Sequence, residues 1–146
     1  LDAFDGGGAP ALASMLSDGS LLSLVDAWPN VGGLGWTWLN AAQPPRVEII
    51  TSHADADGLI VRALRDAAPD LKALLVACTG HGTINAPLEA ALRQAQSEGV
   101  TVWRSSRVAK GGVMPREGDA LFAVEGLTAA QARVALVLHE LGARLF

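Results

Sequence analysis

The stretch from Ala73 to Ser106 constrains the fold of this chain most strongly. An apolar run over 73–77 leads into a small polar turn over 79–83, and a helical pattern then precedes a second apolar run over 100–103. Strands that alternate with helices are joined by crossovers and lie parallel in one sheet. The stretch therefore predicts a strand, helix and strand whose Gly-rich turn follows a buried strand, where α/β proteins bind ligands.

The same alternation continues on both sides of this unit. Short apolar runs over 47–51 and 121–124 predict two more strands. Helical spacing over 58–67 predicts a helix, Pro87 suits the first turn of the next one, and Thr128 opens a third. We therefore expect an α/β domain over residues 46–146, with a three-layer α/β/α, Rossmann-like arrangement around a short, mainly parallel sheet of about four strands.

Apolar residues recur at helical spacing in the first and last of these helices. The predicted faces comprise Leu59, Ile60, Ala63, Leu64 and Ala67 in the first helix, and Val134, Val137, Leu138, Leu141 and Leu145 in the last. Thr128 and Gln131 have the spacing of a capping box at the start of the last helix. Gly99 predicts the end of the middle helix, because glycine adopts the left-handed conformation common there.

Residues 1–45 differ from the rest of the chain. Glycines and the pair Pro44-Pro45 interrupt this segment, so we expect a connecting arm rather than a core. Asp18-Gly19 lies between short apolar pairs and predicts a hairpin turn. Three of the four tryptophans, at positions 28, 36 and 38, lie in this arm without a functional interpretation. The first residue is Leu1 and no signal segment follows it, which suggests a fragment or a processed product.

Charge and hydropathy exclude several classes of partner. The 146 residues carry a net charge of −4 with mixed signs, which argues against a nucleic acid or an anionic membrane surface. Apolar runs stay well below the ~20 residues of a membrane span. The single cysteine, Cys78, has no partner for an internal disulfide, which leaves the compartment open, with the cytoplasm slightly favoured over the periplasm. Because Cys78 follows an apolar strand, we expect a buried structural thiol rather than a nucleophile.

Two short motifs suggest cofactors but lack a required residue. Gly80-His81-Gly82 precedes a helix like a dinucleotide fingerprint, yet Asn85 stands where the third glycine belongs. The loop over 53–58 resembles the start of a calcium loop, yet Leu64 replaces the final carboxylate. We therefore expect no cofactor and no metal, and we expect Asp55 or Asp57 to cap the following helix.

Charged residues after the apolar run over 100–103 suggest a role in binding or assembly. Arg104-Ser105-Ser106-Arg107 ends this run, and a structural or interface role is favoured for both arginines. Because neighbours in a strand alternate between faces, one arginine should face inward and need a partner. Glu117 and Asp119 form an acidic pair in the loop over 108–119, where a carboxylate is usually solvated. No nucleophile paired with a base can be assembled from these motifs.

These motifs together resemble the C-terminal domain of the bacterial-type L-asparaginase/glutaminase family, the threonine amidohydrolases. The matching segments are the turn Cys78 to Thr83, the Arg-Ser-Ser-Arg run at 104–107, the Gly/Pro loop at 111–115, the stretch Leu127 to Val134, and the entry over 45–50. The resemblance is tight over 73–134 and loose over 1–45. It implies hydrolysis of the side-chain amide of L-asparagine or L-glutamine by the whole protein.

In this family the nucleophilic threonine belongs to an N-terminal domain whose motifs are missing here. The resemblance therefore implies that this chain contains no catalytic residue, is inactive alone, and joins a homo-oligomer in which it lends side chains to a neighbouring subunit's site. The implied residues are Thr83 and Glu117 (or Asp119) for substrate positioning, and Gly80, His81, Gly82, Arg104, Ser105, Ser106 and Arg107 for the site turn and the interface. The alternative is a stand-alone α/β module that binds a small ligand or forms oligomers without catalysis.

Overall fold

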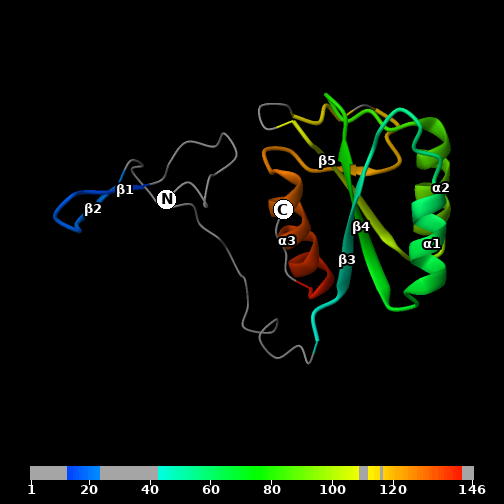
Figure 1. Ribbon diagram of the computed structural model, residues 1–146, viewed down its shortest axis with the longest axis horizontal. Coiled ribbons are helices and arrows are strands. Elements are labelled where there is room, and N and C mark those ends of the chain that lie inside the picture. Colours follow the sequence, from blue (N-terminus) through cyan, green and yellow to red (C-terminus); the bar gives the residue numbers. More distant parts are fainter. Residues whose placement is uncertain (1–12, 24–42, 109–111, 116, 143–146) are drawn as a thin grey trace.

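The structure is a computed structural model, and it describes residues 13–23, 43–108, 112–115 and 117–142. A parallel sheet and its helices account for most of the described residues (Figure 1). The elements, in chain order, are β1 (Ala13–Met15), β2 (Leu21–Ser23), β3 (Arg46–Thr51), α1 (Leu59–Ala67), β4 (Leu71–Cys78), α2 (Ala86–Ser97), β5 (Thr101–Ser106), β6 (Phe122–Ala123) and α3 (Ala129–Glu140).

The sheet has four strands in the order β3-β4-β5-β6, and each pair is parallel. Strand β4 therefore lies between β3 and β5, with Leu75 opposite Ile49 on one side and Trp103 on the other. All but one of the β4 side chains are buried, as expected for a strand whose two faces are both covered. The predicted α/β fold with a short parallel sheet is confirmed.

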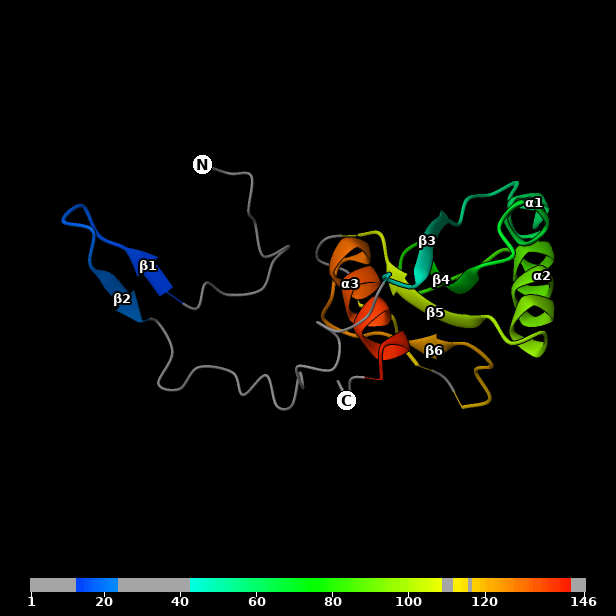
Figure 2. The same cartoon turned by 90° about the horizontal axis from the view of Figure 1, so that it is seen from below.

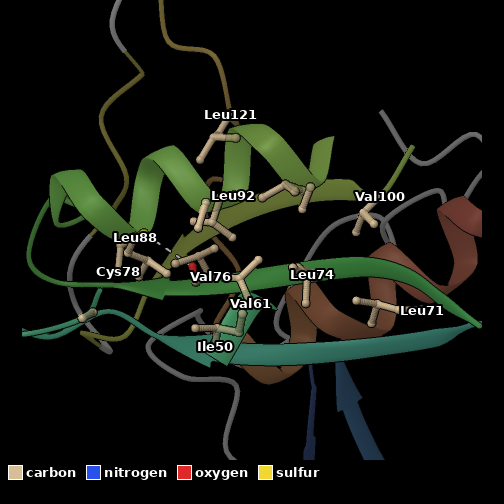
Figure 3. Packing of buried hydrophobic residues seen from close by; sticks show 14 of the residues in the cluster. Ile50, Val61, Leu71, Leu74, Val76, Cys78, Leu88, Leu92, Val100 and Leu121 are labelled. Atoms are coloured by element: carbon tan, nitrogen blue, oxygen red, sulfur yellow. Dashed lines mark hydrogen bonds between the residues drawn. The ribbon is translucent and has the colours of Figure 1, made fainter. Parts of the chain in front are cut away.

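Helices cover both faces of this sheet. Figure 2 shows α3 on one side and α1 and α2 on the other. Side chains from β4 and α2 fill the space between strand and helix, as Figure 3 shows for Leu74, Val76, Leu88 and Leu92. The opposite face packs Leu75 and other residues of β3, β4 and β5 against α3. Two apolar layers therefore hold the sheet in place, and each removes apolar surface from water.

Local signals place the helix ends where the sequence predicts them. Pro87 lies in the first turn of α2, and Gly99 follows its C-cap with a φ of 94°. At the start of α3 the Thr128 hydroxyl accepts a hydrogen bond from the Gln131 N–H at 3.3 Å. The Gln131 side chain accepts in turn from the Thr128 N–H at 2.9 Å. The predicted capping box is confirmed.

The buried face of α1 differs from the prediction. Val61 is fully buried and Leu64 is partly buried against the core, whereas the side chains of Leu59 and Ile60 are exposed by 63% and 50%. Apolar residues occur on more than one side of this helix, so their spacing cannot identify the side that meets the sheet. The sequence pattern therefore predicted the helix and the inward position of Leu64 correctly, but it wrongly assigned Leu59 and Ile60 to the buried face.

The same error occurs in α3. Its buried residues are Ala132 and Leu136, while Val134 is 55% exposed and Val137, Leu138 and Leu141 are only partly buried. Leu145 lies outside the described residues. Alanine at position 132 contributes little hydrophobicity to a sequence pattern, yet it lies fully buried against the sheet. The short side chain was therefore missed as a core residue.

The hairpin predicted at Asp18-Gly19 is confirmed by the antiparallel pairing of β1 with β2. The Asp18 carboxylate accepts hydrogen bonds from the N–H and the hydroxyl of Ser20, at 2.9 and 2.6 Å. These hydrogen bonds lower the pKa of Asp18 below its usual value. The three tryptophans of the arm lie outside the described residues. Within the described part of the chain, no helix is both long and apolar enough to cross a membrane.

Candidate functional site

The Gly-rich turn over residues 79–83, called the Gly turn below, closes on itself directly after β4. The N–H groups of Gly82 and Thr83 both donate to the Thr79 carbonyl, at 3.0 and 3.1 Å. Thr79 donates back to the Thr83 carbonyl through its N–H at 3.3 Å and its hydroxyl at 3.2 Å. These bonds satisfy the backbone at the carboxyl edge of the sheet and leave Thr83 exposed to solvent.

Strand β5 continues three residues beyond the predicted end at Trp103. Arg104, Ser105 and Ser106 pair with β4 and are buried, so they lie within the sheet rather than in a loop after it. The Ser106 hydroxyl donates to the Gly80 carbonyl at 2.8 Å and accepts from the Val108 N–H at 3.1 Å. The end of β5 is therefore bonded to the Gly turn, which explains how polar residues are accommodated there.

The inward arginine predicted from the sequence is Arg104, and Arg107 is the exposed one. Arg104 is only 8% exposed. Its Nη1 donates to the Gly82 carbonyl at 3.2 Å, and its Nη2 forms an ion pair with Asp119. Within the described residues, its Nε and the Ser105 hydroxyl are buried without a hydrogen-bond partner. The guanidinium thus connects two segments that are far apart in the sequence.

Residues 112–115 and 117–121, called the acidic loop below, pack against the Gly turn. The Met114 N–H donates to the His81 carbonyl at 3.1 Å. Val113 is buried, and a Cβ added at Gly82 would lie 2.5 Å from its Cγ1. Gly82 has a φ of +100°, so glycine is required both by the backbone conformation and by this close approach.

A cavity of about 170 Å³ lies where the Gly turn, α2 and the acidic loop meet. The Gly turn and the residue after it, α2, β5 and the acidic loop contribute its lining, which consists of His81, Gly82, Thr83, Ile84, Glu89, Arg104, Met114, Asp119, Ala120 and Leu121. The structure therefore brings together His81, Gly82, Thr83, Arg104 and Asp119 among the residues considered from sequence. Glu117 is exposed and does not line the cavity.

Glu89 is a lining residue that the sequence reasoning missed. It lies in the first turn of α2, directly after the Gly turn, and pairs with Arg93 one helical turn later, at 2.6 Å. An acidic residue in the first turn commonly stabilises a helix through its dipole, so its position has an ordinary structural explanation. A carboxylate close behind a Gly-rich turn is the signal that could have identified it.

Asn85 fixes the loop that follows β3. Its side-chain amide donates to the carbonyls of Ala54 and Ala56, at 2.8 and 3.0 Å. The N-cap of α1 is Gly58 rather than Asp55 or Asp57, so that prediction was wrong, but Asp57 accepts a hydrogen bond from the Leu59 N–H at 2.9 Å at the start of the helix. Among the described residues, no three His, Cys, Asp or Glu side chains are grouped as they would be around a metal ion.

Cys78 is fully buried at the end of β4, as predicted. Its thiol donates to the Val76 carbonyl at 3.5 Å. Burial raises the pKa of the Cys78 thiol from 9.0 to about 11, and the nearby positive charge of Arg104 opposes this rise only in part. A thiol with a raised pKa is mostly protonated at neutral pH and is a poor nucleophile.

Cys78 should make the stability of the domain depend on pH above 9. Between pH 9 and 11 the unfolded chain releases the thiol proton and the folded chain retains it, so stability falls as the pH rises. A shift of this size corresponds to roughly 2–3 kcal/mol. Urea unfolding of the wild type and of Cys78→Ala, measured from pH 8 to 11, should show curves that converge as pH rises. Parallel curves would contradict the burial of a protonated thiol.

Comparison with known proteins identifies a family and similar solved structures. Residues 46–139 match a family model described as the glutaminase/asparaginase C-terminal domain. Among solved structures, the chain is similar to one described as a probable cytoplasmic L-asparaginase from Campylobacter jejuni, with 28% sequence identity and a TM-score of 0.64. The match covers 69% of this chain and 34% of that chain, so this chain corresponds to about a third of the matched protein's length. No curated protein matches the chain.

Proposed function

Because this chain belongs to the glutaminase/asparaginase C-terminal domain family, we propose that it supplies half of an amidohydrolase active site. In the complete protein this site converts L-asparagine and water to L-aspartate and ammonia. Residues 1–45 are the linker from an N-terminal domain that carries the nucleophile. The domain contributes substrate-positioning side chains and subunit contacts to a homo-oligomer, and it is inactive alone.

The observation that carries this proposal is the meeting of the Gly turn and the acidic loop at the carboxyl edge of the sheet. Thr83 leaves the Gly turn with its side chain exposed, and Glu117 is exposed in the acidic loop. Hydrogen bonds from Met114 to His81 and from Arg104 to Gly82 hold these segments together. Two exposed polar side chains at one edge of the sheet are suited to a substrate presented by another subunit.

Each of these side chains has a distinct chemical role in the proposal. The Glu117 carboxylate attracts the α-ammonium group of the substrate, and the Thr83 hydroxyl donates or accepts a hydrogen bond to orient it. Neither group forms or breaks a covalent bond. Their contribution is orientation, which lowers the barrier by presenting the amide to the nucleophile in a reactive geometry.

Asp119 is the less suitable substrate carboxylate. Its side chain lines the cavity, but it is already engaged in an ion pair with Arg104. Binding an ammonium group there would require that pair to be shared or broken, and the buried Arg104 would lose charge compensation. We therefore assign substrate positioning to Glu117 and a structural role to Asp119.

Substitutions at Thr83 and Glu117 test this proposal in the complete protein, with this domain joined to its nucleophile-bearing domain. Because a small loss of orientation can lower the rate strongly, Thr83→Ala and Glu117→Gln should each lower kcat/KM for L-asparagine by about 10- to 100-fold. Matched controls are Thr101→Ala at the opposite end of β5 and Glu125→Gln, an exposed carboxylate outside the cavity. Unchanged kcat/KM in both test variants would refute the assigned site.

A further inference from the structure

We infer that Arg104 is a positioning residue that holds the Gly turn and the acidic loop in one fixed arrangement, so that Thr83 and Glu117 enter the neighbouring site as a unit. This inference rests on the proposed function. It assigns to a buried arginine a role in substrate binding that is exerted through other residues, without contact with the substrate.

The geometry of the Arg104 contacts carries the inference. One terminal nitrogen donates to the carbonyl of Gly82, the residue directly before Thr83. The other forms an ion pair with Asp119, two residues after Glu117. A single planar guanidinium thus fixes the backbone next to one predicted substrate contact and a side chain next to the other. Movement of either segment would break one of these two bonds.

Arg104 is itself held rigidly. It lies within β5, where it is paired with Val76 of the central strand β4. Only 8% of its surface is exposed, and the side chain of Asp119 is 27% exposed. Water and salt screen a pair in this environment less than a pair on the surface, so the attraction between the two charges is stronger. The sheet therefore serves as the fixed reference to which both segments are attached.

The backbone contacts between the two segments do not make Arg104 redundant. The hydrogen bond from Met114 to His81 and the packing of Val113 against Gly82 join the beginning of the acidic loop to the turn. Asp119 lies five residues beyond Met114, and Glu117 lies between them. In the described residues, the Arg104–Asp119 pair therefore fixes the second half of the loop, which carries Glu117.

The substitution Arg104→Lys tests the forked geometry of the guanidinium separately from its positive charge. The single ammonium group of lysine keeps the charge but lacks the planar pair of terminal nitrogens that reaches two partners in fixed directions. Arg104→Lys can therefore compensate Asp119 or bond Gly82, but it should not hold both as arginine does. The matched control pair is Arg46 and Asp70, an exposed ion pair at the start of β3.

The kinetic test uses the complete protein and L-asparagine. Arg104→Lys and Asp119→Asn should each raise KM about tenfold while kcat changes by less than threefold, because Thr83 and Glu117 are still present to orient the substrate once it has bound. The double variant should be no worse than either single variant, since both remove the same connection. The control variants Arg46→Lys and Asp70→Asn should leave KM unchanged. The inference would be overturned if the two single increases in KM multiplied in the double variant, or if KM were unchanged in both test variants.

Amide hydrogen exchange of the 146-residue chain gives a readout that does not depend on activity. Arg104→Lys should speed exchange at Gly82, Thr83 and Met114 at least tenfold and leave Leu75 in β4 unchanged, which excludes general unfolding. Unchanged exchange at the turn would overturn the inference even if KM rose. Faster exchange with an unchanged KM would overturn it as well. If the complete wild-type protein releases no ammonia, the proposed function fails, and exchange still decides whether Arg104 holds the two segments.

Discussion

Replacing Leu74 with alanine is expected to lower the free energy of unfolding by about 3–5 kcal/mol. Leu74 is fully buried in β4, the strand that pairs with both β3 and β5. Its side chain packs in the layer between the sheet and helices α1 and α2 (Figure 3). The loss combines the hydrophobic transfer energy of the removed atoms with the cavity left behind, since neighbouring strands prevent collapse around the site. Urea unfolding at neutral pH measures it.

Leu59→Ala is the matched control for this prediction. Leu59 undergoes the same chemical change, but it is 63% exposed at the start of α1. Leucine and alanine have similar helix propensities, so the change should stay within about 0.5 kcal/mol. Equal losses for Leu74→Ala and Leu59→Ala would show that the assigned core is wrong.

Replacing Gly82 with alanine is expected to destabilise the domain by about 2–4 kcal/mol, combining backbone strain with overpacking. Its φ of +100° is unfavourable for any residue with a Cβ. The new Cβ would also lie 2.5 Å from Val113, so the acidic loop would have to move away from the Gly turn. In the complete protein, the same variant should raise KM for L-asparagine, because Thr83 and Glu117 would lose their relative placement.

The variant Gly80→Ala distinguishes the backbone strain from the overpacking. Gly80 belongs to the same turn and has a φ of +49°, but a Cβ there meets no atom within 4 Å. Only the left-handed backbone is penalised, at about 1–2 kcal/mol. Thermal or urea unfolding of both variants should therefore rank Gly82→Ala as clearly worse. The reverse order would contradict the packing of Val113 on the turn.

The parts of the fold that the sequence predicted correctly depend on local chemistry. Continuous apolar runs identified β4 and β5, because a strand covered on both faces has no polar alternation. Thr128 and Gln131 identified the start of α3 through hydrogen bonds within one helical turn. Asp18-Gly19 identified the hairpin through a turn conformation that glycine favours. Each signal involves residues close together in the chain.

The parts that could not be predicted depend on contacts between distant segments. The buried sides of α1 and α3 are chosen by the sheet, and helical spacing alone wrongly placed Leu59 and Val134 on them. The end of β5 was placed too early because Arg104 looks unsuited to a buried strand. It is tolerated there because Asp119, fifteen residues later, compensates its charge.

In the candidate site, too, features set by local sequence could be predicted and features set by distant contacts could not. The Gly turn and the acidic loop could be identified from sequence, because glycines and polar residues follow apolar strands there. Which carboxylate faces which partner could not be predicted, since the sequence does not show the three-dimensional surroundings of Glu117 and Asp119. The structure places Asp119 against Arg104 and leaves Glu117 exposed, and this difference underlies the roles proposed for them.

Ammonia release from L-asparagine tests the central claim most directly. It should be measured on the 146-residue chain alone and on the same chain joined to the nucleophile-bearing N-terminal domain of an asparaginase. If this domain supplies half of a site, only the joined protein releases ammonia, and its kcat/KM falls when Thr83 or Glu117 is replaced. Turnover by the pure 146-residue chain would contradict the account, because the chemistry would then reside within the chain itself.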